Sequence, residues 1–387
     1  MVAVLGCCSA QIIGEVMFLN YIKSTLRNIQ RYPMYSCINL AGLVLGISIS
    51  LLIFIWVFNE LSYDRFHKHS SNIVRVIEKR HFPESIQYSS RTPGLLAPFL
   101  KNEYQEIKDL TRHAWTGERI IKRGDVKHYE QWIVCVDISF FNIFSFPFIH
   151  GDKQSALTDL YSIVITEKIA EKYFGDENPI GKTMTLDNRF DLTVTGVIED
   201  VPSNSHFRFD MAVPFEIVEK LGWNAKTWKF SLTSTYLYLD RKTDISRFEE
   251  KISGFIKNHD PDTNIELSLQ PLHKIHLYSN FYNPNSPGKI QYVWIFAVIG
   301  ILILLMACIN YMNLATARSE VRIKEVGIRK VLGANRNNLL LQFQVEAIFL
   351  VFIAVLISPV VLSLFIPQFN KITGEIFSFN NFFGIVN

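Results

Sequence analysis

Charged residues are scarce in this sequence, and the scarcity narrows the class of protein. Asp, Glu, Lys and Arg together make up only 19% of the 387 residues, whereas apolar residues reach 49%. The formal net charge is only +3. A nucleic-acid-binding protein would carry a strongly basic face, so the composition argues against a nucleic-acid partner. A chain this apolar is typical of a membrane protein with a substantial water-exposed part.

Cysteine is also scarce, and its five positions show no metal-ligand spacing. The positions are Cys7, Cys8, Cys37, Cys135 and Cys308. Only Cys135 falls in the long polar segment, so that segment has no internal disulfide to form. A cysteine-stapled secreted scaffold is therefore excluded.

The sequence lacks the familiar catalytic patterns, with no Gly-x-Ser-x-Gly elbow and no His-Glu-x-x-His motif. Two histidine pairs have the short spacing of metal ligands, His67 with His69 and His273 with His276. Neither pair has a third ligand at a recognisable distance, so we expect structural histidines. Residues 175–183 resemble a phosphate-binding loop, but one residue too many separates the glycines and a helix is expected before them. We expect no catalytic residue, metal or cofactor.

Three long apolar segments are present, at residues 38–58, 290–311 and 346–366. Each is long enough to cross the roughly 30 Å hydrocarbon core of a bilayer as a helix. Pro359 is expected to bend or break the third helix. Before the first segment, residues 17–37 pair an apolar stripe with a basic one, which predicts an amphipathic helix at the membrane interface.

Residues 60–289 differ in composition, because they are polar and rich in turns. Strands are expected at 73–77 and elsewhere, separated by single helices such as 95–110. This alternation predicts an α+β domain. The expected fold is a multi-pass α-helical membrane protein with a large α+β extracytoplasmic domain. Residues 1–16 are interpreted as an N-terminal extension that precedes the natural start.

The most basic short connection lies between the second and third apolar segments, at residues 312–345. Its clustered cations are Arg318, Arg322, Lys324, Arg329, Lys330 and Arg336. Connections rich in Lys and Arg remain in the cytoplasm. This rule places the connection in the cytoplasm. Because each apolar segment crosses the membrane once, residues 60–289 and the tail at 367–387 are then expected outside the cytoplasm.

The same connection is predicted to form a short, rigid elbow. Residues 315–331 are strong helix formers, and Glu325 with Arg329 has the favoured acid-first spacing. Gly333 is placed to end the helix with a left-handed residue. The apolar contact surface is expected from Val321, Ile328, Val331 and Leu332. The alternative is a solvated basic loop that only sets the topology.

Small residues recur on one face of the first apolar segment, at Gly42, Gly46 and Ser50. Small residues at four-residue spacing let two helices approach closely in a membrane. This face is predicted to pack on another helix, with the partner helix left open.

Several longer motifs resemble one family. The sequences NYMNLATARS at 310–319 and KEVGIRKVLGA at 324–334 closely resemble the FtsX-like domain of MacB-type ABC transporter permeases. The sequences SYDRFH at 62–67, YFGDENPIGK at 173–182 and VTGVIEDVPSNSH at 194–206 resemble the MacB-type periplasmic core domain, in its Bacteroidetes-like form.

The resemblance implies a permease subunit without its own ATPase site, driven by a partner ABC ATPase for export or extraction of a substrate. It implies that the subunit lies in the bacterial inner membrane. It also implies as partners a second permease copy or second half, and periplasmic or outer-membrane components. It maps the ATPase-coupling interface onto Glu325, Gly327, Arg329, Lys330 and Gly333. Family members have a fourth membrane helix, so the chain is expected to be truncated before that helix.

A transmembrane sensor is the alternative function, with residues 60–289 binding a ligand. A sensor would follow its second span with a long signalling coiled coil, whereas here a short elbow leads into a third span. The sequence identifies neither the cargo of a permease nor the ligand of a sensor.

Overall fold

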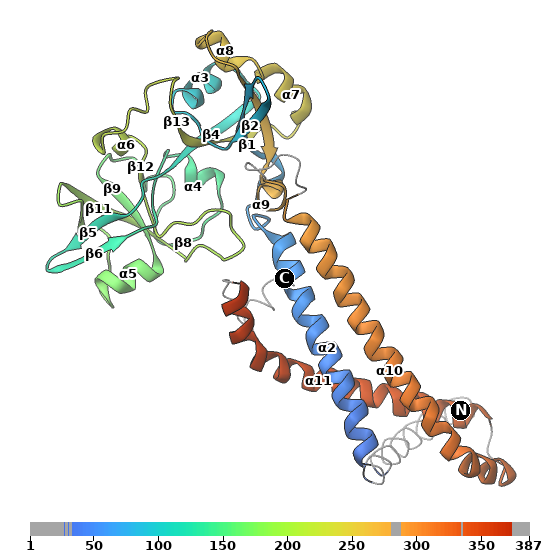
Figure 1. Cartoon of the computed structure of the whole chain (residues 1–387). Coiled ribbons are helices and arrows are strands. Elements are labelled where there is room, and N and C mark those ends of the chain that lie inside the picture. Colours follow the sequence, from blue (N-terminus) through green and yellow to red (C-terminus); the bar gives the residue numbers. More distant parts are fainter. Residues whose placement is uncertain (1–26, 28–29, 31–32, 280–287, 334–335, 374–387) are drawn as a thin grey trace, which may run out of the picture. The chain divides into compact units, whose positions relative to one another are not determined.

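The computed structural model describes residues 27, 30, 33–279, 288–333 and 336–373 (Figure 1). The chain divides into two compact units. Unit 1 comprises Met1–Phe58 with Tyr292–Asn387, and unit 2 comprises Asn59–Gln291. The N-terminal extension expected at 1–16 lies outside the described residues, as do most of the predicted interfacial helix at 17–37 and most of the tail at 367–387.

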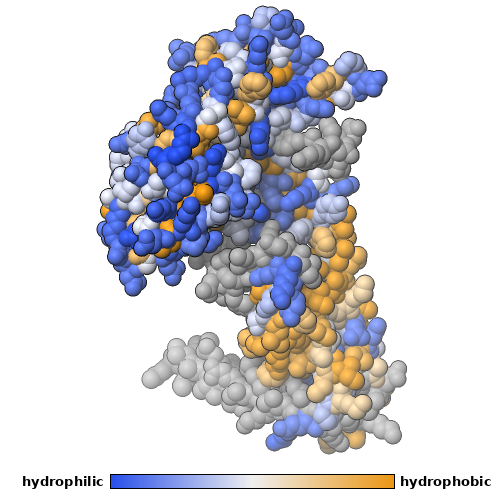
Figure 2. Space-filling view, turned by 60° about the vertical axis from the view of Figure 1, so that its left-hand side comes forward, coloured by the Kyte–Doolittle hydropathy of each residue, from blue (hydrophilic) through white to orange (hydrophobic). Residues whose placement is uncertain are grey.

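Unit 1 is built from long helices that contain the three apolar segments. They are α2 (Pro33–Ser62), α10 (Ile290–Val331) and α11 (Arg336–Thr373). Windows at Pro33–Ser62, Ile290–Ala317 and Leu339–Lys371 are long and apolar enough to cross a membrane. Apolar side chains cover much of the surface of these helices (Figure 2). All three helices extend beyond the predicted segments. Helix α11 continues through Pro359, so a break there is wrong, whereas a bend stays a prediction.

Small residues lie where α2 approaches α10. A Cβ on Gly46 would overlap the Ala307 side chain, and one on Gly42 would lie 3.1 Å from the Asn310 side-chain nitrogen. The hydroxyl of Ser50 donates a hydrogen bond of 3.0 Å to the carbonyl of Gly300. The partner helix left open by the sequence is therefore α10.

Unit 2 is formed around a large, mostly antiparallel sheet. Its strand order is β14-β1-β13-β4-β7-β12-β9-β11-β10-β5-β6, with β2, β3 and β8 paired off this path. The strands are β1 (Ile73–Phe82), β2 (Ser85–Ser89), β3 (Thr92–Pro93), β4 (Ile107–Trp115), β5 (Arg119–Arg123), β6 (Val126–Glu130), β7 (Ile133–Val136), β8 (Phe148–Gly151), β9 (Ser162–Thr166), β10 (Thr183–Leu186), β11 (Phe190–Ile198), β12 (Met211–Pro214), β13 (Ser231–Leu239) and β14 (Ile265–Pro271). Parallel pairing joins β9 to β11 and β7 to β12.

Short helices pack on this sheet. They are α3 (Leu96–Glu103), α4 (Phe140–Ile143), α5 (Glu167–Phe174), α6 (Ile217–Lys220), α7 (Ile245–Ile252), α8 (Phe255–His259) and α9 (Ile275–Tyr278), with 3₁₀ turns η1 (Ser70–Asn72) and η2 (Leu272–Lys274). The α+β class predicted for this domain is confirmed.

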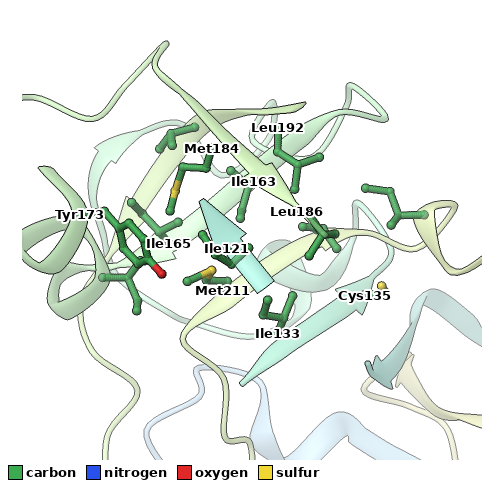
Figure 3. Close-up of a cluster of buried hydrophobic side chains, with 14 of the residues drawn as sticks. Ile121, Ile133, Cys135, Ile163, Ile165, Tyr173, Met184, Leu186, Leu192 and Met211 are labelled. Carbon is green, nitrogen blue, oxygen red and sulfur yellow. The ribbon is translucent and has the colours of Figure 1, made fainter. Parts of the chain in front are cut away.

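Three apolar clusters form the core among the described residues of unit 2. One cluster packs α5 and α6 on the strands from β5 to β12, and Figure 3 shows Ile121, Ile163 and Met211 gathered within it. A second is rich in phenylalanine, and a third packs α3, α7 and α8 on β1, β13 and β14. Hydrophobic burial is the main stabilising contribution to such a domain.

The predicted helix at 95–110 is only partly correct. Helix α3 ends at Glu103, and strand β4 begins at Ile107. Strand β4 lies between β13 and β7, so pairing on both sides outweighs its helix-compatible composition. The segment at 175–183 has the predicted helix–turn–strand order, with Gly175 at a positive φ of 57° after α5.

A buried histidine follows α2 in unit 2. The His67 residue is 1% exposed, and its ring contacts Phe144 and Phe146. Its Nδ1 accepts a hydrogen bond from the Ser145 backbone N–H, whereas its Nε2 is buried without a partner. Burial lowers the pKa of His67 to about 3, against a smaller opposing effect of the Asp64 carboxylate.

Acid should destabilise unit 2 through His67. The folded ring stays neutral down to about pH 3, whereas the unfolded ring binds a proton below pH 6.5. The unfolded state therefore binds more protons between pH 6.5 and pH 3. In this range the free energy of unfolding decreases by about 1.4 kcal/mol for each unit by which the pH is lowered. When the pH is lowered from 6.5 to 5, the free energy of unfolding of the variant His67→Gln should decrease by roughly 2 kcal/mol less than that of wild type. Urea unfolding of the full chain in detergent measures this, with His128→Gln as the exposed-histidine control. Equal pH slopes for wild type and His67→Gln would contradict the assignment.

The close-packing role of the small residues on α2 stays a prediction, which a bulky residue tests. Replacing Gly46 by leucine should force α2 away from α10 and destabilise unit 1 by about 1–3 kcal/mol, the usual range for overpacking. Thermal unfolding in detergent measures the effect. The matched control is Ala41→Leu, because Ala41 is exposed on the same helix. Similar melting of both variants would argue against close packing at Gly46.

Candidate coupling element

The basic connection is continuous in structure with the second apolar segment. Helix α10 runs unbroken from Ile290 to Val331, although the sequence placed a boundary at 311/312. Its last turn closes with a hydrogen bond of 3.0 Å from the Gly333 N–H to the Lys330 carbonyl. Gly333 has a φ of 90°, the left-handed conformation predicted for a helix-ending glycine.

The turn after α10 is short. Helix α10 ends at Val331, and α11 begins at Arg336 (Figure 1). Helices therefore lie on both sides of residues 334–335. The role of this elbow, against the alternative of a solvated basic loop that only sets the topology, stays a prediction.

The predicted coupling residues occupy the last two turns of α10 and its end. Gly327, Lys330 and Gly333 are exposed, and a Cβ on Gly327 would meet no atom within 4 Å. Glu325 and Arg329 belong to the same helix, but their side chains lie outside what the structure describes. The five positions are close together in the chain, all within residues 325–333.

Exposed apolar side chains accompany these residues. Val331 is 89% exposed and Leu332 80% exposed, higher than any other large apolar residue in the described part of the chain. Ile328 is 63% exposed. The apolar window of this helix ends at Ala317. At about 1.5 Å per residue, Val331 lies roughly 20 Å farther along the helix.

Exposed apolar side chains outside a membrane span are more typical of a surface that binds another protein than of a catalytic or metal site. Contiguous exposed apolar groups beside charge mark interaction surfaces. Among the described residues, no group of three His, Cys, Asp or Glu side chains could hold a metal ion. Sequence analysis named Ile328, Val331 and Leu332 but missed Ile323, which is 66% exposed.

Sequence analysis also missed a buried polar network in unit 2. It joins Glu60 to His276 and Asp64 to His206. The available signal was the SYDRFH motif, in which an acid and a histidine lie three residues apart next to an apolar span. The two partner histidines are remote in sequence, so spacing alone could not identify them.

Comparison with known proteins identifies both parts of the chain. Residues 36–255 match the family described as MacB-like periplasmic core domain, and residues 297–387 match the FtsX-like permease C-terminal domain. The crystal structure of the periplasmic region of MacB from Actinobacillus actinomycetemcomitans is 15% identical, with a TM-score of 0.40. It covers 51% of this chain and 88% of that one.

Two curated relatives are similar in sequence. The macrolide export ATP-binding/permease protein MacB of Neisseria gonorrhoeae is 26% identical over 215 residues, covering 53% of this chain and 30% of the relative. The uncharacterized ABC transporter permease YknZ of Bacillus subtilis is 22% identical over 352 residues, covering 88% and 84%. This chain therefore spans less than a third of the MacB relative. Since the MacB-like match alone covers more than half of its length, the chain belongs to the MacB/FtsX-type permease family.

Proposed function

We propose that this chain is the membrane subunit of an ABC transporter and transmits the motion of a partner ATPase to its extracytoplasmic domain. The observation that carries the proposal is the continuity of α10. This helix has 42 residues, and at about 1.5 Å per residue it is roughly 60 Å long, more than the 40–45 Å of a whole bilayer. One rigid element thus runs from the elbow to the chain that leaves unit 2.

The composition of the spans supports mechanical transmission. No Asp, Glu, Lys, Arg or His occurs in residues 38–58, 290–311 or 347–366. Ionisable groups inside a membrane commonly mark substrate or ion pathways. A subunit that moves its outer domain needs no such pathway through the bilayer.

The exposed end of α10 supplies the contact for the ATPase. Val331 and Leu332 offer apolar area, and Lys330 and Arg329 offer charge. We place the elbow in the cytoplasm by the positive-inside rule. The chain then crosses the bacterial inner membrane three times, with unit 2 in the periplasm.

The proposal includes a second permease copy or second half, and periplasmic or outer-membrane components. MacB of Neisseria gonorrhoeae is named a macrolide exporter. For this chain we propose export or extraction without a named cargo. No observation in the structure favours the sensor alternative.

Reversing the charges of the elbow should uncouple the chain from its ATPase. The double variant Glu325→Lys with Arg329→Glu should abolish stimulation of the partner ATPase, because a charged contact surface would meet like charges. The ATPase that co-purifies with the chain is assayed with each permease variant in nanodiscs. The control reverses the same charges on exposed α7, Glu250→Lys with Arg247→Glu, and should keep full stimulation. Normal stimulation by the elbow variant would remove this surface from the mechanism.

Orientation is tested by cysteine labelling in a background without native cysteines. A cysteine at exposed Ser203 should react with an impermeant maleimide added to intact cells. One at exposed Asn337 should react only after the membrane is opened with detergent. The reverse pattern would overturn the topology.

A further inference from the structure

Two segments of unit 2 lie next to the membrane helices in the chain. The inbound segment, residues 59–67, includes the last turn of α2. The outbound segment, residues 272–279, contains η2 and α9 and precedes α10 in the chain. Any motion that reaches unit 2 through the chain passes through one of these segments.

A buried acid–histidine pair joins the two segments. Glu60 Oε2 lies 2.6 Å from His276 Nε2, and the two side chains are only 5% and 11% exposed. The Tyr63 ring stacks on the His276 ring, with centroids 3.3 Å apart and planes 5° from parallel. His276 therefore holds two residues of the inbound segment, one through a hydrogen bond and one through ring contact.

A second set of contacts fastens the inbound segment to the loop before β12. The Asp64 N–H donates to the Asn204 carbonyl at 2.9 Å, and the His206 N–H donates to Asp64 Oδ1 at 3.0 Å. The Asn204 side chain also donates to the Ser62 hydroxyl at 3.0 Å. These contacts join residues about 140 positions apart in sequence.

The same aspartate begins a line of polar side chains that reaches the outbound segment. His206 Nδ1 lies 2.8 Å from Asp64 Oδ1, and its Nε2 lies 2.9 Å from the Tyr236 hydroxyl. Arg75 hydrogen-bonds to Tyr236 and also donates to the Ser279 hydroxyl at 3.0 Å. Tyr236 and Arg75 lie on adjacent strands, β13 and β1, and are paired in register.

Burial of this network is unfavourable unless its contacts are kept. Asp64 is fully buried and Arg75 only 7% exposed. Burial alone would raise the pKa of Asp64, but attraction to His206 and hydrogen bonds from that residue hold the pKa below its ordinary value. Removing one partner from a buried charged group leaves the other uncompensated, which is strongly destabilising. Apolar contacts alone could hold these segments on the sheet without this strong dependence of stability on single polar partners.

We propose that Glu60–His276 and the line Asp64–His206–Tyr236–Arg75 form a clasp that makes the inbound and outbound segments move as one body with the sheet. The clasp rests on the proposed function, since its use is to pass the motion of the membrane helices into unit 2. Glu60 and His276 are its positioning residues, and the Asp64 line anchors them to β13 and β1.

Hydrogen exchange of the full chain in nanodiscs tests the clasp without the ATPase. His276→Ala should speed exchange by about tenfold in its own segment and in the inbound segment, because a lost buried contact lowers the local opening free energy. The Asp64 and His206 amides report the remote effect. Amides of β9 and β12 should stay protected, which shows that the domain remains folded. His276→Gln, which keeps a donor for Glu60, should restore much of the protection.

The matched control is His81→Ala. His81 Nε2 lies 3.0 Å from Glu266 Oε2 in an exposed acid–histidine pair between β1 and β14. Its loss should leave both segments unchanged. Faster exchange confined to residues 272–279 in His276→Ala would overturn the clasp, because the two segments would then open separately.

Adding the co-purifying ATPase with a non-hydrolysable ATP analogue tests the use of the clasp. Wild type and His81→Ala should show a nucleotide-dependent change of exchange in unit 2, and His276→Ala should lose it. Retention of the change in His276→Ala overturns transmission through the clasp. Absence of the change in wild type overturns the proposed function instead, whereas the experiment without ATPase still decides whether the clasp exists.

Discussion

Every backbone polar group in hydrocarbon must be satisfied by its own helix or by a packed neighbour, and the architecture of unit 1 depends on this constraint. It explains why the apolar segments are helices longer than the segments themselves. It also explains the hydroxyls among them. Ser358, next to Pro359 in α11, donates 2.7 Å to the Ala354 carbonyl of its own helix and 3.4 Å to the Val44 carbonyl of α2. Helix α11 also continues through Pro359, a residue that has no N–H to donate.

Unit 2 is stabilised in a different way. Its three apolar clusters bury whole faces of the sheet, and this accounts for the domain as a folded body. Buried charged groups also lie where the chain enters from α2, at Glu60 and Asp64. Polar contacts are directional and demand defined geometry, whereas apolar contacts tolerate sliding. A directional network at these segments suits a domain that must follow the helices attached to it.

The elbow and the clasp solve related mechanical problems at two regions of the chain. The elbow presents exposed apolar and basic groups at the end of a long helix, where we propose that an ATPase binds. The clasp joins the two segments through which the proposed motion would reach the sheet. Between them the spans carry no Asp, Glu, Lys, Arg or His that would line a pathway. This composition agrees with the proposed function, in which the chain transmits movement.

Local features of the sequence predicted the elements that depend on local physics. Apolar length placed the three long helices, because a span needs about 20 apolar residues whatever surrounds it. Gly333 marked the end of α10, since its left-handed conformation favours glycine. Asp187 and Asn188 join β10 to β11 and both have a φ of 52°, a conformation that Asp and Asn adopt more readily than most residues.

Features that depend on distant partners were decided only by the tertiary structure. Residues 107–115 form strand β4 because β13 and β7 flank them, which no local pattern reveals. His276 looked like half of a weak histidine pair until the fold placed it beside Glu60, 216 residues away. The sequence by itself determined the three apolar helices and the glycine at the end of α10, since each follows from residues that are close together in the chain. Only the fold brought the clasp together, because buried charges are stabilised by partners that long-range packing selects.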